Sequence, residues 1–152
     1  MLKKISIFLF FSIVWSFSFA APTILFKKIG TGKEYGEPIY SGRATITGNY
    51  EKNYEDYTVM GINNPVCFNL SDQDLKNIPT PITANFCFSN SKQAQNLLHL
   101  PKTAKKGCFY QGRATITIKN FSEFSALDPA ALDFTLLLSV DKLSEPTISC
   151  NK

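Results

Sequence analysis

The chain has 152 residues, 44% of them hydrophobic and 18% charged, and its 16 Lys and Arg against 12 Asp and Glu give a net charge of +4. This length supports one domain with a modest core and excludes a second domain. The charge is too small for phosphate neutralisation to drive tight binding, so nucleic acid is not expected as a partner.

Residues 1–20 have the pattern of a secretory signal peptide. Lys3 and Lys4 form a basic start, residues 5–15 are apolar, and small residues precede the expected cleavage point after Ala20. The apolar segment is shorter than the ~20 residues that a membrane-spanning helix needs. We therefore expect export and removal of this leader rather than an uncleaved anchor.

Removal of the leader would leave residues 21–152 as one β domain, without stable membrane insertion and located in the periplasm or outside the cell. The leader holds two lysines and no acid, so the mature chain has 14 basic and 12 acidic residues, a net charge of +2. Part of the apparent basicity therefore belongs to targeting, which weakens the case for nucleic acid further.

The first expected element of the mature chain is an edge strand over residues 23–26, followed by a glycine-rich loop over residues 30–36. Gly30-x-Gly32 lacks the lysine–threonine pair and the helix of a phosphate-binding loop. We therefore interpret these glycines as turn residues that lead into the first long strand.

Two strands are marked by a repeat at residues 40–47 and 110–117. Seven of eight positions are identical, reading Tyr-Ser-Gly-Arg-Ala-Thr-Ile-Thr in the first copy and Tyr-Gln-Gly-Arg-Ala-Thr-Ile-Thr in the second. Ala and Ile alternate with Arg and Thr, which predicts half-buried strands with a basic, hydroxyl-bearing outer face.

The other elements follow from alternation, turn signals and one helical pattern. Asn90 and Gln93 form a capping-box pattern, and Pro101 ends the helix that follows. His99 lies in the last turn without a recognisable acid–base partner, so a surface or packed role is favoured over catalysis. In chain order, we expect strands at residues 40–50 or 40–57, 58–70, 82–88, 108–121 and 134–142, with the helix between the third and fourth and a helical turn near residues 130–131.

Three strands, a short helix and two further strands are the element order of the OB-fold, a five-stranded Greek-key barrel with its helix between strands three and four. We therefore predict a single mainly β domain with this OB-like architecture, and a β-sandwich is the competing fold. In the barrel the first and fourth strands are neighbours, and here they carry the repeat. Arg43 and Arg113 would then begin adjacent strands on the solvent face.

All four cysteines lie in the mature part of the chain. An even number in an exported protein indicates two disulfides, and the lack of closely spaced ligand pairs argues against zinc. We favour a bond between Cys87 and Cys108, which would bracket the helix, and a second between Cys67 and Cys150, which would hold the tail. The alternative pairing is Cys67 with Cys87 and Cys108 with Cys150.

This chain combines several sequence motifs. They are the leader, the two Tyr-x-Gly-x-Ala-Thr-Ile-Thr strand openings, the Pro65-Val66-Cys67-Phe68 strand, the Phe86-Cys87-Phe88-x-Asn90 helix entry and the terminal Cys150. With them the sequence resembles small exported proteins of Gram-negative bacteria that have OB-like domains and no assigned activity. The resemblance covers most of the mature chain and implies a compartment and a fold, but no catalytic residues.

For function we predict a non-catalytic binding module that contacts a protein, peptide or glycan, because arginine and tyrosine on a strand face supply hydrogen bonds and stacking area. A small secreted hydrolase is the alternative, although no Gly-x-Ser-x-Gly elbow or spaced pair of acids is present. We expect a monomer without cofactor or metal. The candidate binding residues are Tyr40, Arg43, Tyr54, Tyr57, Tyr110 and Arg113.

Overall fold

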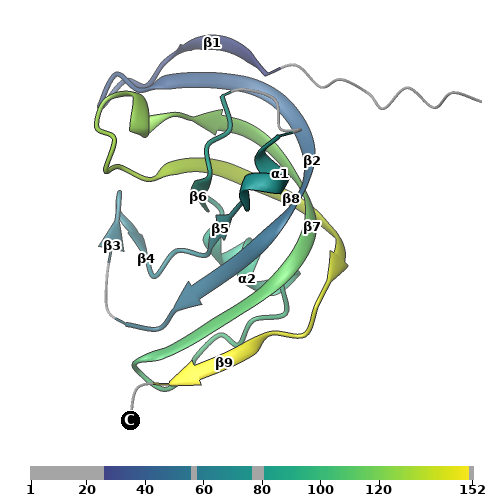
Figure 1. Ribbon diagram of the computed structural model, residues 1–152. Helices are drawn as coiled ribbons and strands as arrows, with labels where there is room; N and C mark the ends of the chain where they lie inside the picture. The colour runs from purple at the N-terminus through teal and green to yellow at the C-terminus, as the bar shows by residue number, and fades with distance from the viewer. Residues whose placement is uncertain (1–25, 56–57, 77–80, 151–152) are drawn as a thin grey trace, which may run out of the picture.

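The computed structural model describes residues 26–55, 58–76 and 81–150, which form a mainly β structure (Figure 1). The predicted leader, its cleavage site and Tyr57 lie outside these residues. The strands are β1 (Lys27–Thr31), β2 (Pro38–Asn53), β3 (Thr58–Val59), β4 (Ile62–Asn63), β5 (Cys67–Asn69), β6 (Asn85–Phe88), β7 (Cys108–Ser122), β8 (Asp133–Leu143) and β9 (Thr147–Cys150). The helical segments are α1 (Asp72–Leu75), α2 (Ser91–Leu97) and the 3-10 turn η1 (Phe124–Ala126).

Within the described residues, seven strands form one sheet in the order β1-β2-β5-β6-β8-β7-β9, and β2 pairs with β7 as well. The pairing therefore runs from β2 through β5, β6, β8 and β7 back to β2. β6 and β8 are parallel, and the other neighbouring strands of the sheet are antiparallel. In Figure 1 the long strands β2, β7 and β8 curve around one side of the molecule, and the β3–β4 hairpin lies apart from them.

The two strands that carry the repeat, β2 and β7, are antiparallel neighbours along most of their length, as predicted, and the two copies face each other over residues 45–47 and 115–117. Alternate residues of both strands point into the core, including Ala44 and Ile46 of β2 and Ala114 and Ile116 of β7. The predicted strand at residues 108–121 therefore agrees with β7 to within a residue. Strong period-two alternation made these two strands the clearest elements of the sequence.

The outer face of this strand pair carries threonines that bind one another. The Oγ1 atoms of Thr45 and Thr117 are 3.0 Å apart, and those of Thr47 and Thr115 are 2.9 Å apart. Each threonine lies directly opposite its partner in the register of the two strands. The hydroxyl-bearing outer face predicted from the repeat is present, and its hydroxyls satisfy one another across the strands.

Aromatic side chains form the core beneath these strands. Phe68 and Phe86 are fully buried and stack with their ring centroids 5.6 Å apart. Tyr50 extends inward from β2 and its hydroxyl donates a hydrogen bond to the carbonyl oxygen of Ser144, at 3.1 Å. A Cβ atom at Gly112 would come within 2.3 Å of that hydroxyl, so the close approach of β7 to Tyr50 requires glycine there.

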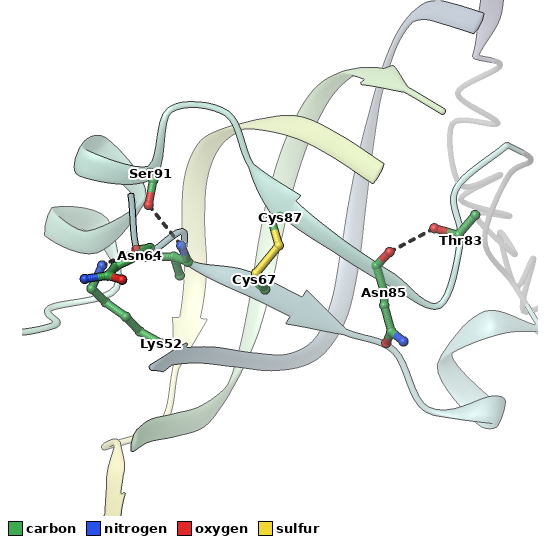
Figure 2. Close-up of a disulfide and its surroundings, with 8 residues drawn as sticks. Lys52, Asn64, Cys67, Thr83, Asn85, Cys87 and Ser91 are labelled. Atoms are coloured by element: carbon green, nitrogen blue, oxygen red, sulfur yellow. Dashed lines mark hydrogen bonds between the residues drawn. A yellow bond between two sulfur atoms is a disulfide. The ribbon is translucent and has the colours of Figure 1, made fainter. Parts of the chain in front are cut away.

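Two disulfides join neighbouring strands in the pairing that we treated as the alternative. Cys67 bonds to Cys87 (Figure 2), and Cys108 bonds to Cys150. The favoured bonds between Cys87 and Cys108 and between Cys67 and Cys150 are therefore wrong. The reason is strand register, because Cys67 lies opposite Cys87 on β5 and β6, and Cys108 lies opposite Cys150 on β7 and β9. The Cα atoms of each bonded pair are 3.9 Å apart.

The single strand predicted over residues 58–70 is divided into three. Its first part is the hairpin of β3 and β4, whose turn residues Met60 and Gly61 have φ angles of 47° and 75°. Positive φ at both central residues is typical of a two-residue type I′ turn, which reverses the chain. β5 begins only at Cys67, after Pro65.

Other boundaries also differ from the predicted ones. Of the expected edge strand only Phe26 lies in the described part of the chain, and it precedes β1. The helix α2 begins after Asn90, as predicted, and His99 follows it with a φ angle of 53°. α1, β9 and η1 were not predicted. Residues 130–131, expected to form a helical turn, lie in a separate non-helical turn, in which the Ala131 amide donates to the Asp128 carbonyl oxygen at 2.8 Å.

Candidate functional site

The residues predicted to bind are spread along two strands. Because β2 and β7 are antiparallel, Arg43 lies opposite Lys119, whereas Arg113 lies opposite Asn49. Six steps along β2 separate Arg43 from Asn49, which is about 20 Å at ~3.3 Å per residue. The repeat thus places its two arginines on one outer face but far from each other.

Several of these side chains already have partners within the protein. The Tyr40 hydroxyl donates a hydrogen bond to Glu123 Oε2 at 2.8 Å, and this bond raises the pKa of Tyr40. The Arg113 guanidinium donates to both carboxylate oxygens of Asp74, at 3.0 and 3.2 Å. Arg43 is exposed, without an ion pair to a described residue. Of these three side chains, Arg43 is the one whose polar group has no hydrogen-bond or ion-pair partner among the described residues.

Tyr54 and Tyr110 are the predicted binding residues that the fold brings together. Their rings meet edge to face with centroids 5.3 Å apart. The Tyr54 side chain is buried and its hydroxyl donates to the Pro101 carbonyl oxygen. Burial, followed by the influence of Tyr110, raises the pKa of Tyr54 to about 12. This tyrosine therefore fixes local structure as well as lining the cavity described next.

An open groove with a volume of about 680 Å³ lies beside Tyr54, at the end of β2. Its floor comes from β2, one wall from the β3–β4 hairpin and the residue after it, and the other wall from the start of α2 and the residues before it. Three lysines contribute to the lining: Lys52, Lys92 and Lys102. We refer to this cavity as the lysine groove.

Lys52 occupies the floor of the lysine groove. It belongs to the inward-pointing series of β2, and only 5% of its surface is exposed. Its Nζ atom donates a hydrogen bond to the Asn64 carbonyl oxygen at 2.6 Å and lies 5.2 Å from the centroid of the Tyr54 ring. No acidic side chain pairs with it among the described residues. Burial accordingly lowers the pKa of Lys52.

The helix wall of the groove is anchored to the body by side chains that bond to backbone. Ser91 Oγ accepts a hydrogen bond from the Val66 amide at 2.9 Å. The Asn90 side chain donates to the Leu137 carbonyl oxygen at 2.8 Å and accepts from the Leu137 amide at 3.0 Å. Figure 2 shows Lys52, Asn64 and Ser91 together on one side of the Cys67–Cys87 disulfide. The wall positions are therefore set before any ligand arrives.

Side chains that form hydrogen bonds make up most of the lining of the lysine groove. Five carboxamide side chains and two serines accompany the lysines: Asn63, Asn64, Asn90, Gln93, Gln95, Ser89 and Ser91. Asp, Glu, His and Cys do not occur among the described residues of its lining. In the described part of the chain, no three His, Cys, Asp or Glu side chains are grouped so that they could hold a metal ion. The groove can donate many hydrogen bonds and present positive charge.

Of the groove residues, the sequence-based site included Tyr54 and missed all three lysines. A signal for Lys52 did exist, because it falls in the apolar series that runs through Ala44, Ile46 and Tyr50 at intervals of two residues. A lysine in such a series is either an error of register or a buried cation. Lys92 gave no comparable signal. Lys102 lies in a basic segment with Lys105 and Lys106, for which a solvated loop is the default interpretation and an anion contact the alternative.

The chain matches no protein-family model, no curated protein and no solved structure. None of the helices in the described segments combines the length and apolar character needed to cross a membrane.

Proposed function

We propose that this chain is an exported, disulfide-stabilised binding module built on an OB-like five-stranded barrel. The strands of that barrel would be β2, β5, β6, β7 and β8, whose pairing runs from β2 around to β2 again. The parallel β6–β8 pair and the position of α2 between β6 and β7 also fit this architecture. Two disulfides fit an oxidising compartment, and we propose the periplasm or the exterior as the location.

The ligand site in this proposal is the lysine groove. One observation carries it: hydrogen-bonding groups from β2, the β3–β4 hairpin and the start of α2 converge on one open cavity of about 680 Å³. A concave site with several fixed polar groups is the usual form of a ligand pocket. The anchors at Ser91 and Asn90 keep its wall in place, so little ordering entropy opposes binding.

The outer face of β2 and β7 supports a ligand site less well. Its threonines bind each other and Arg113 binds Asp74, so a ligand would have to displace existing partners. Arg43 and Lys119 are exposed on that face and form a second, smaller candidate surface. A small hydrolase is not favoured, because general acid–base catalysis in the groove would have to use a lysine or Tyr54, with no carboxylate or histidine among its described lining residues.

The proposal can be tested by nuclear magnetic resonance on the oxidised protein with a panel of soluble probes: maltohexaose, chitohexaose, an oligogalacturonate, hexa-alanine and hexaglutamate. We expect at least one probe to shift the backbone amide signals of Lys52, Asn63 and Gln93. The Gln93→Ala variant should weaken that response. Gln111→Ala, an exposed glutamine on β7, should leave the response unchanged.

Two results would contradict this function. Shifts confined to Arg43 and Lys119 would place binding on the outer face, and an unresponsive protein across the panel would remove the groove as a site. Mass spectrometry of the same mixtures would detect cleaved probes, which would establish a hydrolase instead of a binding module.

A further inference from the structure

Lys52 is a buried cation whose bonding capacity is only partly used. An ammonium group has three N–H donors, and among the described residues one acceptor uses them, the Asn64 carbonyl oxygen at 2.6 Å. The face of the Tyr54 ring supplies a further weak attraction. Burying a charge without an opposite charge is costly, and the chain retains this cost at the floor of an open groove. The buried ammonium group is therefore suited to an acceptor with negative charge.

The groove around Lys52 carries more charge of the same sign. Lys92 and Lys102 line it, are exposed, and form no ion pair with a described residue. The described lining thus contains three lysines and no acid. A cleft lined by charge of one sign concentrates oppositely charged ligands, and its walls strengthen the field.

We propose that the lysine groove binds an acidic glycan, with a sugar carboxylate seated against Lys52 Nζ and the rest of the chain crossing Lys92 and Lys102. This inference deepens the proposed function and rests on it. Carboxamides such as Asn63 and Gln93 are suited to sugar hydroxyls, because their NH2 groups can donate while their oxygens accept from Thr58 and Asn90. An acidic peptide fits less well, since its side chains seek apolar pockets and Ile62 is the one aliphatic side chain in the described lining.

The decisive probe is an oligogalacturonate compared with its fully methyl-esterified form, which keeps the sugar ring and loses the charge. Isothermal titration calorimetry should show that the acid binds at least about tenfold more tightly than the ester, since one charged hydrogen bond is worth that factor. Hexaglutamate should bind more weakly than the oligogalacturonate, and sodium sulfate should compete with it only weakly.

Variants separate Lys52 from the general charge of the protein. Lys52→Met preserves the length of the side chain and removes the buried charge, and it should weaken oligogalacturonate binding about 10- to 100-fold. The double variant Lys92→Gln/Lys102→Gln should weaken binding by a smaller factor. Its matched control is Lys27→Gln/Lys28→Gln, which removes two exposed charges from β1 and should change binding less than twofold.

Thermal unfolding of each variant shows whether a loss of binding reflects loss of the fold, and the exposed double variants test the proposal even if Lys52→Met unfolds. Equal binding of acid and ester would overturn the inference and leave the proposed function standing, provided that the ester still shifts the groove signals. Tighter binding of hexaglutamate would replace glycan with acidic peptide. Equal losses in the two double variants would reduce the effect to net charge and also overturn it.

Discussion

The outer face of the β2–β7 pair and the lysine groove are both built on β2, but they treat their polar groups in opposite ways. On the outer face, Thr45 binds Thr117 and Thr47 binds Thr115 across the strands. In the groove, Lys52 points inward from the same strand and meets a carbonyl oxygen and an aromatic ring, but no described acid. The threonines of the outer face are partners of one another, whereas Lys52 has no oppositely charged partner among the described residues.

This difference teaches which polar residues of a strand are informative about function. A polar side chain on the solvent side needs no special explanation, because water or a cross-strand neighbour satisfies it. A charged side chain on the core side imposes a desolvation cost, so its presence demands a partner or a role. The conspicuous repeat of this chain therefore explains strand pairing, whereas the single lysine at position 52 marks the candidate site.

The largest expected effect is a difference in the free energy of unfolding between core-facing and outward-facing substitutions on β7. Ile116 is fully buried, and Ile116→Ala should lower the free energy of unfolding by about 2–5 kcal/mol, because it removes buried methyl groups and leaves a cavity. Thr117→Ala, one residue further on the outer side, should cost less than about 1 kcal/mol. Urea unfolding of both variants measures the contrast. Equal losses would show that the threonine ladder contributes as much as the core.

The two disulfides differ in their exposure to solvent. Each should contribute about 2–4 kcal/mol to stability. Cys67 and Cys87 are buried behind the groove, whereas Cys150 is exposed on β9. Limited dithiothreitol treatment should therefore reduce the Cys108–Cys150 bond first, since exchange requires access to a sulfur atom. Alkylation and peptide mass spectrometry would follow the order. Earlier labelling of Cys67 and Cys87 would mean that the groove region opens more readily than the strand β9.

Local pattern was sufficient to predict the elements with strong periodicity, and insufficient where long-range register decides. Alternation identified β2 and β7, and turn residues marked the region of Pro65. The cysteine pairing depended on which residues face each other on separate strands. Cys67 and Cys87 are 20 residues apart in sequence and become neighbours only through the β5–β6 register.

The capping box predicted from the sequence and the one present in the structure belong to different helices. Asn90 and Gln93 matched a capping box, and Asn90 is the N-cap residue of α2, but its side chain makes no capping bond and binds Leu137 instead. The capping box that does form belongs to Ser71 and Asp74 at α1. A four-residue helix leaves no apolar stripe in the sequence, so periodicity could not identify it.

Asp74 offers an intermediate test on the outer side of the fold. The Ser71 hydroxyl and then Arg113 hold the pKa of Asp74 below its ordinary value of 3.8. Because the folded pKa is the lower one, this carboxylate stabilises the protein above pH 3.8, and the contribution is lost as the pH falls through the lowered pKa. Asp74→Asn should cost about 1 kcal/mol at pH 7, discounted for the half-exposed Arg113, and progressively less as the pH falls below 3.8.

Asp72→Asn is the matched control for this prediction, since Asp72 is an exposed carboxylate on the same short helix. It should cost less than about 0.5 kcal/mol, as exposed substitutions usually do. Equal losses from the two variants at pH 7 would remove the capping box and the Arg113 bridge as the cause.

The smallest expected change in stability, and the most specific one, concerns Lys52. Burial lowers its pKa from the ordinary value of 10.5, so the unfolded chain binds the proton more tightly than the folded chain. Stability should therefore rise as the pH rises between the lowered pKa and 10.5, while below that window the full cost of the buried charge is present. At pH 7, Lys52→Met should leave the free energy of unfolding unchanged or raise it by up to about 1 kcal/mol, because the buried charge is gone.

The advantage of Lys52→Met over the unaltered protein should shrink as the pH approaches 10.5. The Tyr54 hydroxyl, with its pKa raised to about 12, acts in the opposite direction above pH 10. It is present in both proteins, so the difference between them cancels its effect. Lys92→Met, which replaces an exposed lysine of the same groove, is the matched control for the loss of a lysine side chain. A Lys52→Met protein that is less stable at pH 7 by more than about 1 kcal/mol would show that the ammonium serves the fold. In that case the uncompensated charge would no longer argue for a bound anion.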